Sequence, residues 1–167
     1  TNSSLISQED VRDELGLADW ISVKIDAVIK EIWKQIDRPH GKLNLYEILE
    51  GLKIFSKKYE GILCTESMLI HNLNDSEQNL SDLAKFISTL KPEISYLSIP
   101  TRPPAEPWVK PATEKTLTQA YQLFIDQGIH TEYLIGYEGN EFAFTGNVEQ
   151  DILSITAVHP MRQDAIE

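Results

Sequence analysis

The sequence predicts an α/β protein built on a parallel sheet. Strand-like and helix-like segments alternate along its 167 residues, an order typical of parallel strands that are connected through helices. Polar residues recur inside the apolar strand segments, which indicates that one face of the sheet borders a lumen or a cleft. A composition of 41% hydrophobic and 25% charged residues is that of a globular domain long enough to bury a core.

The first part of the chain predicts a helix, a strand and two further helices. Ser7, followed by acidic residues, begins a helix that ends near Gly16. The run WISVKIDA (20–27) alternates as a strand does, and a short helix over 28–36 follows it. Apolar residues at helical spacing then predict a helix over 45–59.

The rest of the chain predicts three more strands, with helices between them and in the tail. The elements in order are a strand over 62–70, a helix capped by Asp75 or Ser76 and ending at Leu90, a strand over 94–100, a helix from Thr113 through Ile125, a strand over 131–137, an amphipathic helix over 148–158 and a last helix after Pro160. The chain therefore divides into a domain over 1–140 and a helical tail over 141–167.

Charge and cysteine content exclude several classes of protein. The net charge of −11 repels phosphate, so the composition does not support nonspecific nucleic-acid binding. Cys64 is the single cysteine, which rules out an internal disulfide or a cysteine-based metal cluster from this chain alone. No apolar run is long enough to span a membrane and no signal-peptide pattern opens the chain, so we expect a cytoplasmic protein.

Charged residues in the strands form the first candidate site. Lys24 and Asp26 alternate with an apolar face on the first strand, Glu66 repeats the pattern on the second, and Arg102 shares the parity of Ser98 on the third. Burying charge is costly unless partners are present, so these groups are expected to converge and neutralise one another. Such a set marks either a functional site or structural ion pairs that close the mouth of a barrel.

A proline-rich loop follows the third strand. The segment YLSIPTRPPAEPWVKP (96–111) places five prolines within residues 100–111. Each proline fixes its own φ and restricts the residue before it, so the loop holds a fixed shape without regular secondary structure. Rigid loops at strand ends are where binding sites are built.

Six segments together resemble the radical S-adenosylmethionine (radical SAM) proteins. They are, in order, TNSSLI (1–6), ADWISVKIDA (18–27), IDRPH (36–40), TESMLIHNLNDS (65–76), SIPTRPPAEPWVKP (98–111) and YEG (137–139). The branch most similar to them is often labelled Fe-S oxidoreductase and is related to the wyosine-type tRNA-modifying synthases. The resemblance covers nearly the whole chain.

This resemblance implies a partial (β/α) barrel of TIM-like, radical SAM type. In such enzymes a [4Fe-4S] cluster and S-adenosylmethionine together generate a 5′-deoxyadenosyl radical, and the protein positions the reactants. The family's CxxxCxxC motif and its GGEP-like segment are absent here, and TNSSLI resembles the segment after the family's third strand. The resemblance thus implies the C-terminal half of a longer enzyme, inactive by itself, whose partner is the missing half-barrel and whose substrate is unknown.

The resemblance also assigns cofactor-binding residues. Ser22, Lys24 and Asp26 match positions that contact the ribose or carboxylate of S-adenosylmethionine, and Glu66, Ile70 and Asn72 match positions that line the adenosine. The cofactor-binding set is completed by Ser98 and Arg102, and Pro100 and Thr101 lie beside them where the strand ends; none of the set is a metal ligand. The tail resembles the start of a small winged-helix-like unit, with an ordinary pair of packed helices as the alternative.

Two functions from other classes stay open. Lys24 could act as the Schiff-base amine of an aldolase-like barrel, activated by desolvation and by neighbouring charge. Alternatively, the chain is a noncatalytic module that self-associates through the open edge of its sheet, because unpaired strand edges are adhesive.

Overall fold

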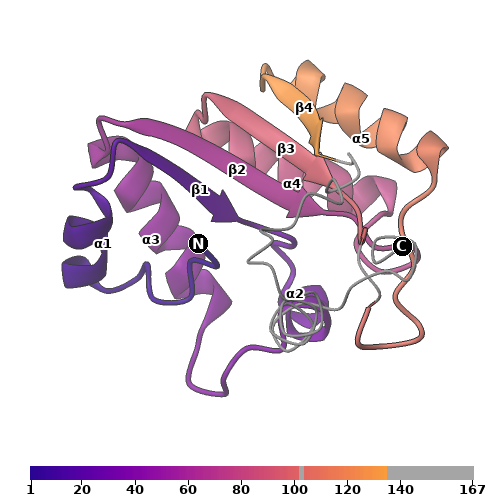
Figure 1. The fold of residues 1–167 in the computed structure, drawn as a ribbon, viewed down its shortest axis with the longest axis horizontal. Coiled ribbons are helices and arrows are strands. Elements are labelled where there is room, and N and C mark those ends of the chain that lie inside the picture. Colours follow the sequence, from indigo (N-terminus) through magenta and orange to yellow (C-terminus); the bar gives the residue numbers. More distant parts are fainter. Residues whose placement is uncertain (102–103, 135–167) are drawn as a thin grey trace, which may run out of the picture.

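The computed structural model describes residues 1–101 and 104–134. They form a parallel sheet of four strands in the spatial order β1-β2-β3-β4, the same as their order in the chain. Each crossover therefore advances the sheet by one strand in one direction, as in part of a (β/α) barrel. Helices α3, α4 and α5 lie together on one face of this sheet, behind it in Figure 1. The predicted fold class is confirmed.

The strands and helices follow the predicted order. The strands are β1 (Trp20–Lys24), β2 (Ile62–Met68), β3 (Ile94–Ser98) and β4 (Thr131–Leu134). The helices are α1 (Glu9–Leu15), α2 (Lys30–Ile36), α3 (Leu45–Lys58), α4 (Glu77–Leu90) and α5 (Glu114–Asp126). The predicted end of the fourth strand, Arg102 and the tail over 141–167 lie outside the described residues.

The first three strands are shorter than predicted. β1 ends at Lys24 rather than at residue 27, β2 ends at Met68 rather than at residue 70, and β3 ends at Ser98 rather than at residue 100. The last backbone hydrogen bond between the β1 and β2 segments runs from the Ile25 N–H to the Glu66 carbonyl at 2.8 Å. Beyond it, side chains take over: the Met68 N–H donates to Asp26 Oδ1 at 2.8 Å. The alternation of apolar and polar residues continues in the sequence beyond the place where strand pairing stops. It therefore could not show that backbone groups there bond to side chains and not to a neighbouring strand.

Capping side chains set the starts of the longer helices. Ser76 accepts a hydrogen bond from the Asn79 N–H, and Thr113 accepts one from the Thr116 N–H, as predicted. Asp75 is not the cap of α4, because its carboxylate accepts from the Asn72 N–H and contacts His71 instead. The first helix is capped by Gln8 rather than by Ser7, without a side-chain bond.

The two faces of the sheet differ in burial. Ile21 and Val23 of β1 are buried on the helix-covered face, together with apolar residues of α3, α4 and α5. Trp20 lies on the opposite face, where it is 52% exposed and directly across from Ile62, itself 51% exposed. Cys64 also has the parity of this face, and it is a buried free thiol, as expected for a packed residue.

Candidate functional site

A cavity of about 610 Å³ lies at the carboxyl ends of β2, β3 and β4. This is the edge at which open α/β sheets and barrels bind ligands. Its lining includes Met68 and Ile70 from the end of β2, Ser98 and Ile99 from the end of β3, and Leu134 of β4. Apolar side chains dominate the lining, and a few polar groups interrupt them, as in most small-molecule sites.

The proline-rich loop forms one wall of this cavity. The loop residues that line the cavity are Pro100, Thr101, Pro104, Ala105, Glu106, Trp108 and Val109. The returning end of the loop is tied to the segment after β2, where the His71 N–H donates to the Lys110 carbonyl at 2.8 Å and the Ala112 N–H donates to the Leu69 carbonyl at 3.3 Å. These bonds anchor the returning end of the loop beside the cavity.

Three charged side chains reach this cavity. Glu66 accepts a hydrogen bond from the Ser98 hydroxyl, Oγ to Oε1, at 3.0 Å. Arg38, from the segment after α2, forms a 2.7 Å ion pair with Glu106 of the proline-rich loop. The Arg38 guanidinium lowers the pKa of Glu106, through a hydrogen bond and through its charge. The cavity thus offers a carboxylate at the strand end and an ion pair on the loop side.

A second, smaller cavity of about 130 Å³ lies between the end of β1 and helices α2 and α3. Lys24 and Asp26 both line it, with 3.4 Å between Lys24 Nζ and Asp26 Oδ2, and Asp37 lies there too. Burial raises the pKa of Asp26 from 3.8 to about 7, against the opposing effect of Lys24. A carboxyl group with such a pKa exchanges protons near neutral pH, which is the property of a general acid or base.

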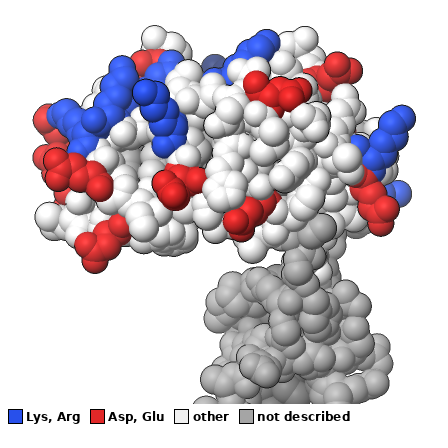
Figure 2. Space-filling model, turned by 90° about the horizontal axis from the view of Figure 1, so that it is seen from above, with Lys and Arg blue, Asp and Glu red and all other residues white. Residues whose placement is uncertain are grey.

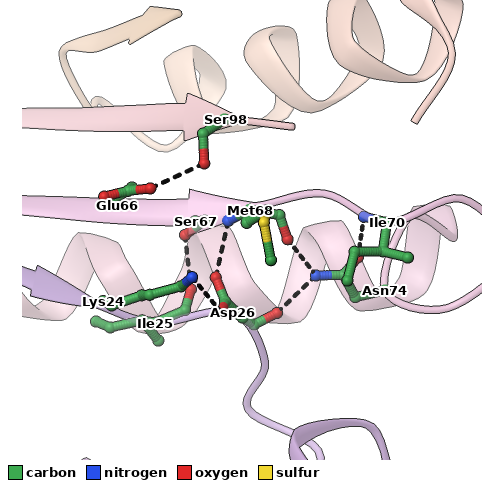
Figure 3. A network of polar contacts seen from close by, with 9 residues as sticks. All are labelled: Lys24, Ile25, Asp26, Glu66, Ser67, Met68, Ile70, Asn74 and Ser98. Atoms are coloured by element: carbon green, nitrogen blue, oxygen red, sulfur yellow. Dashed lines mark hydrogen bonds and ion pairs between the residues drawn. The ribbon is translucent and has the colours of Figure 1, made fainter. Parts of the chain in front are cut away.

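Asn74 fixes the geometry around Asp26 (Figure 3). Its side-chain amide donates to the Asp26 carbonyl at 2.9 Å and to the Met68 carbonyl at 2.8 Å, while Asn74 Oδ1 accepts from the Ile70 N–H at 2.8 Å. The Ser67 hydroxyl adds a bond to the Ile25 carbonyl at 2.7 Å. Side chains thus hold the ends of β1 and β2 together where the strand ladder stops.

The structure separates the predicted cofactor-binding residues into groups. Glu66, Ile70 and Ser98 line the larger cavity, whereas Lys24 and Asp26 line the smaller one. Lys24 is the register partner of Glu66, but each pairs with another group, Lys24 with Asp26 and Glu66 with Ser98. Two predicted residues, Ser22 and Asn72, line neither cavity, and Arg102 lies outside the described residues.

Sequence reasoning missed three residues of these sites. Asn74 and Arg38 stand inside the motifs NDS and IDRPH that carried the family resemblance, so the motifs signalled them without assigning a role. Asp37 lies in the second motif as well, and burial raises its pKa, against the charge of Lys24. Motif residues therefore support the sites both by lining them and by fixing their backbone.

Charged side chains of both signs are spread over the face drawn in Figure 2. The densest group of basic side chains lies at its left end, others lie at its top and right edges, and acidic side chains lie among them and across the middle. Within residues 1–101 and 104–134, no group of three or more His, Cys, Asp or Glu side chains is placed to hold a metal ion. Among the helices of these residues, none has the length and apolar character needed to cross a membrane.

A known protein is similar in sequence to this chain along the chain's whole length. No family model matches the sequence. A UPF0026 protein of Methanocaldococcus jannaschii is 43% identical over 169 aligned residues, an alignment that covers 100% of this chain and 53% of the relative. The chain therefore spans about half the length of this curated relative.

Two solved structures share the fold. A domain of a pyruvate-formate lyase-activating enzyme from Bacteroides vulgatus superposes with a TM-score of 0.63 at 17% identity, covering 78% of this chain and 77% of that one. A radical SAM methyltransferase from Sphaerobacter thermophilus superposes with a TM-score of 0.61 at 18% identity, covering 80% of this chain and 38% of that one. The chain thus resembles a UPF0026 protein in sequence along its whole length, and it shares its fold with a domain of a pyruvate-formate lyase-activating enzyme and with part of a radical SAM methyltransferase.

Proposed function

We propose that this chain is the C-terminal half-barrel of a radical SAM enzyme, and that it supplies cofactor and substrate contacts for the radical modification of a substrate. The observation that carries the proposal is the 610 Å³ cavity at the carboxyl ends of the strands, in a sheet that has the fold of radical SAM domains. The similarity to about half of a longer UPF0026 protein supports the view that the active enzyme includes more chain.

The lining of the larger cavity supports the binding of part of S-adenosylmethionine. Its apolar walls suit a nucleoside ring, while the Glu66 carboxylate and the Ser98 hydroxyl suit the donors and acceptors of a base or a ribose. Glu66, Ile70 and Ser98 would hold the nucleoside, and Lys24 and Asp26, in the smaller cavity, would serve its polar end. When bound and reduced in a complete enzyme, the cofactor supplies a carbon radical, and these residues orient it and exclude water.

The iron-sulfur cluster does not fit the residues of this chain. A [4Fe-4S] cluster needs cysteine thiolates, and the single cysteine, Cys64, is buried on a strand. The cluster ligands would come from the other half-barrel.

The edge of β1 would receive that other half-barrel. The Thr1 nitrogen donates to the Ser22 carbonyl at 2.7 Å, and the Lys24 N–H donates to the Thr1 carbonyl at 2.9 Å. This pair of bonds is the pattern of a parallel bridge opposite Val23. A half-barrel added at this edge would extend the sheet in the parallel sense that a barrel requires.

The aldolase-like alternative stays open. It requires Lys24 Nζ, which lies 3.4 Å from Asp26 Oδ2, to attack a carbonyl substrate, and borohydride trapping would then show a mass adduct on Lys24. The other alternative, a noncatalytic module, requires neither iron nor S-adenosylmethionine. Measuring iron content and S-adenosylmethionine cleavage therefore distinguishes it from the proposed enzyme.

The test is to isolate the native protein anaerobically and to measure its intact mass, its iron content and its reductive cleavage of S-adenosylmethionine. We expect a chain longer than this one, with about four irons per molecule, that produces 5′-deoxyadenosine. In that protein Glu66→Gln should weaken S-adenosylmethionine binding, and Glu60→Gln, at an exposed carboxylate just before β2, should leave it unchanged. A native chain of this length without iron would refute the proposal.

A further inference from the structure

We propose that the Arg38 side of the larger cavity is a binding site for an oxyanion, a carboxylate or a phosphate group, carried by a ligand with an apolar or aromatic body. In the ligand-free chain, Glu106 occupies the place of that anion. The inference rests on the proposed function only in naming this ligand the substrate, because the site itself belongs to this chain and is testable without iron or S-adenosylmethionine.

The backbone places the Arg38 side chain at the cavity. Arg38 follows α2 and precedes Pro39, and its φ of +43° is in the left-handed region that residues other than glycine seldom adopt. A residue before proline normally takes an extended conformation, so this φ is unfavourable twice over. Strained positions of this kind are found where the surrounding structure holds a side chain for function.

The partner of Arg38 is easily displaced. Its Nη2 lies 2.7 Å from Glu106 Oε1, but the Arg38 and Glu106 side chains are 59% and 37% exposed. Ion pairs exposed to this degree contribute little to stability, because water solvates both groups well when they separate. A ligand anion that also buries apolar surface in the cavity would therefore replace the Glu106 carboxylate at small cost. An arginine binds carboxylate and phosphate oxygens alike through its planar set of donors.

The other groups of the cavity define the rest of the ligand. Trp108, Pro104 and Ile36 line it beside Arg38 and offer flat or apolar surfaces to a ring. Glu66 lies at the strand end and would repel a second anion there. The ligand would therefore bind in one orientation, with its anionic group toward Arg38 and its apolar body against the loop.

The experiment titrates the 167-residue chain with phenyl phosphate and, separately, with benzoate, and uses benzyl alcohol as the neutral probe. Binding is followed through the three tryptophan indole N–H signals in ¹⁵N NMR spectra, assigned by Trp→Phe substitutions. We expect saturable shifts of the Trp108 signal, while Trp20, at the far end of β1, stays unchanged.

Substitutions separate this site from general attraction of anions. Arg38→Gln should weaken binding of the anionic probes by about tenfold or more, which is the value expected for a charge-assisted hydrogen bond. Lys42→Gln removes the same charge from an exposed residue that does not line the cavity, and it should change nothing. Glu106→Gln removes the internal competitor and should tighten binding about two- to fivefold, on the small value of an exposed ion pair.

Each result has a defined consequence. Binding of one anion in preference to the other would identify the natural group as a carboxylate or a phosphate. If neither anion shifts the Trp108 signal, or if Arg38→Gln and Lys42→Gln weaken binding equally, the site does not exist as inferred. Either failure leaves the iron and cleavage measurements on the native protein unaffected, so this inference can fail while the proposed function stands.

Discussion

The Asn74 side chain donates a 2.9 Å hydrogen bond to the backbone carbonyl of Asp26, a residue 48 positions earlier in the chain. Both residues are 2% exposed, and the other side-chain bonds of Asn74 join the last residue of β2, Met68, and the Ile70 N–H just after it. A buried amide with every group satisfied fixes its neighbours in one arrangement. Asn74 thus connects the two cavities, because Asp26 lines the smaller one and Met68 the larger.

Asn74→Ala should destabilise the fold by about 2–4 kcal/mol. The substitution leaves the buried Ile70 N–H without an acceptor, and an unsatisfied buried donor costs about 1–3 kcal/mol before the two lost carbonyl partners are counted. Urea unfolding measures the loss. The matched control is Asn79→Ala, which removes one 3.4 Å bond from a partly buried amide and should cost less than about 1 kcal/mol. Equal losses in both variants would show that Asn74 is an ordinary polar residue.

Asp26→Asn should change how stability depends on pH. The folded-state pKa of Asp26, about 7, exceeds its ordinary value of 3.8, so between these pH values the native state holds a proton that the unfolded chain releases. The Asp26 contribution to the free energy of unfolding is therefore fully present below about pH 4 and is lost as pH rises toward 7. The loss is at most about 1.4 kcal/mol per pH unit.

The comparison with the variant isolates this effect. Other carboxylates titrate in the same range, so the measured quantity is the difference in unfolding free energy between Asp26→Asn and the parent, which should rise from pH 4 to pH 7. Lys24 and Asp37 are the charged groups facing Asp26, and Lys24→Met should raise the Asp26 pKa further by removing the opposing charge. A difference that stays flat across this range would mean that Asp26 is ionised in the fold at pH 4.

Gly51→Ala should destabilise the chain, whereas Gly41→Ala should not. A Cβ at Gly51 would lie 2.6 Å from the Ile6 carbonyl oxygen and 2.8 Å from the Ser7 nitrogen, both backbone atoms that cannot turn aside. Helix α3 or the N-terminal segment would have to move, at a cost of about 1–3 kcal/mol. A Cβ at Gly41 meets nothing within 4 Å. Thermal unfolding of the two variants tests this, and a similar midpoint for both would contradict the close approach.

The sequence predicts elements well where one local rule decides them. Ser76 and Thr113 cap their helices because a cap depends on residues three positions apart. The apolar face of β1 could also be predicted, since alternation alone sets which side chains meet the helices. The ends of β1 and β2 could not, because Asp26 and Asn74 replace strand partners there through contacts between distant parts of the chain.

The sequence predicted which residues share a face of the sheet but not how they pair. Glu66 and Ser98 share that face by parity, the structure adds the hydrogen bond between them, and their role in cofactor binding stays a prediction. The expected cluster of Lys24, Asp26 and Glu66 is divided, because Lys24 pairs with Asp26 at the smaller cavity, whereas Glu66 pairs with Ser98 at the larger one. Arg38 escaped notice because a loop arginine carries no periodicity, and only the fold brings it to Glu106.

The open face of the sheet leads to the last prediction. Trp20 and Ile62 are neighbours in register on the face that α3, α4 and α5 do not cover, and each is about half exposed. Contiguous exposed apolar surface promotes association between chains. We expect the 167-residue chain to self-associate with increasing concentration, and Trp20→Thr with Ile62→Thr to reduce this without lowering the unfolding midpoint, since neither side chain is in the core. Sedimentation velocity measures the association.

Tyr46→Thr is the control, because Tyr46 is 71% exposed and lies on α3, away from the strand residues of that face. If the double variant associates as the parent does, the contact lies elsewhere; if it also unfolds more readily, the pair supports the fold of the chain itself rather than contact with another chain.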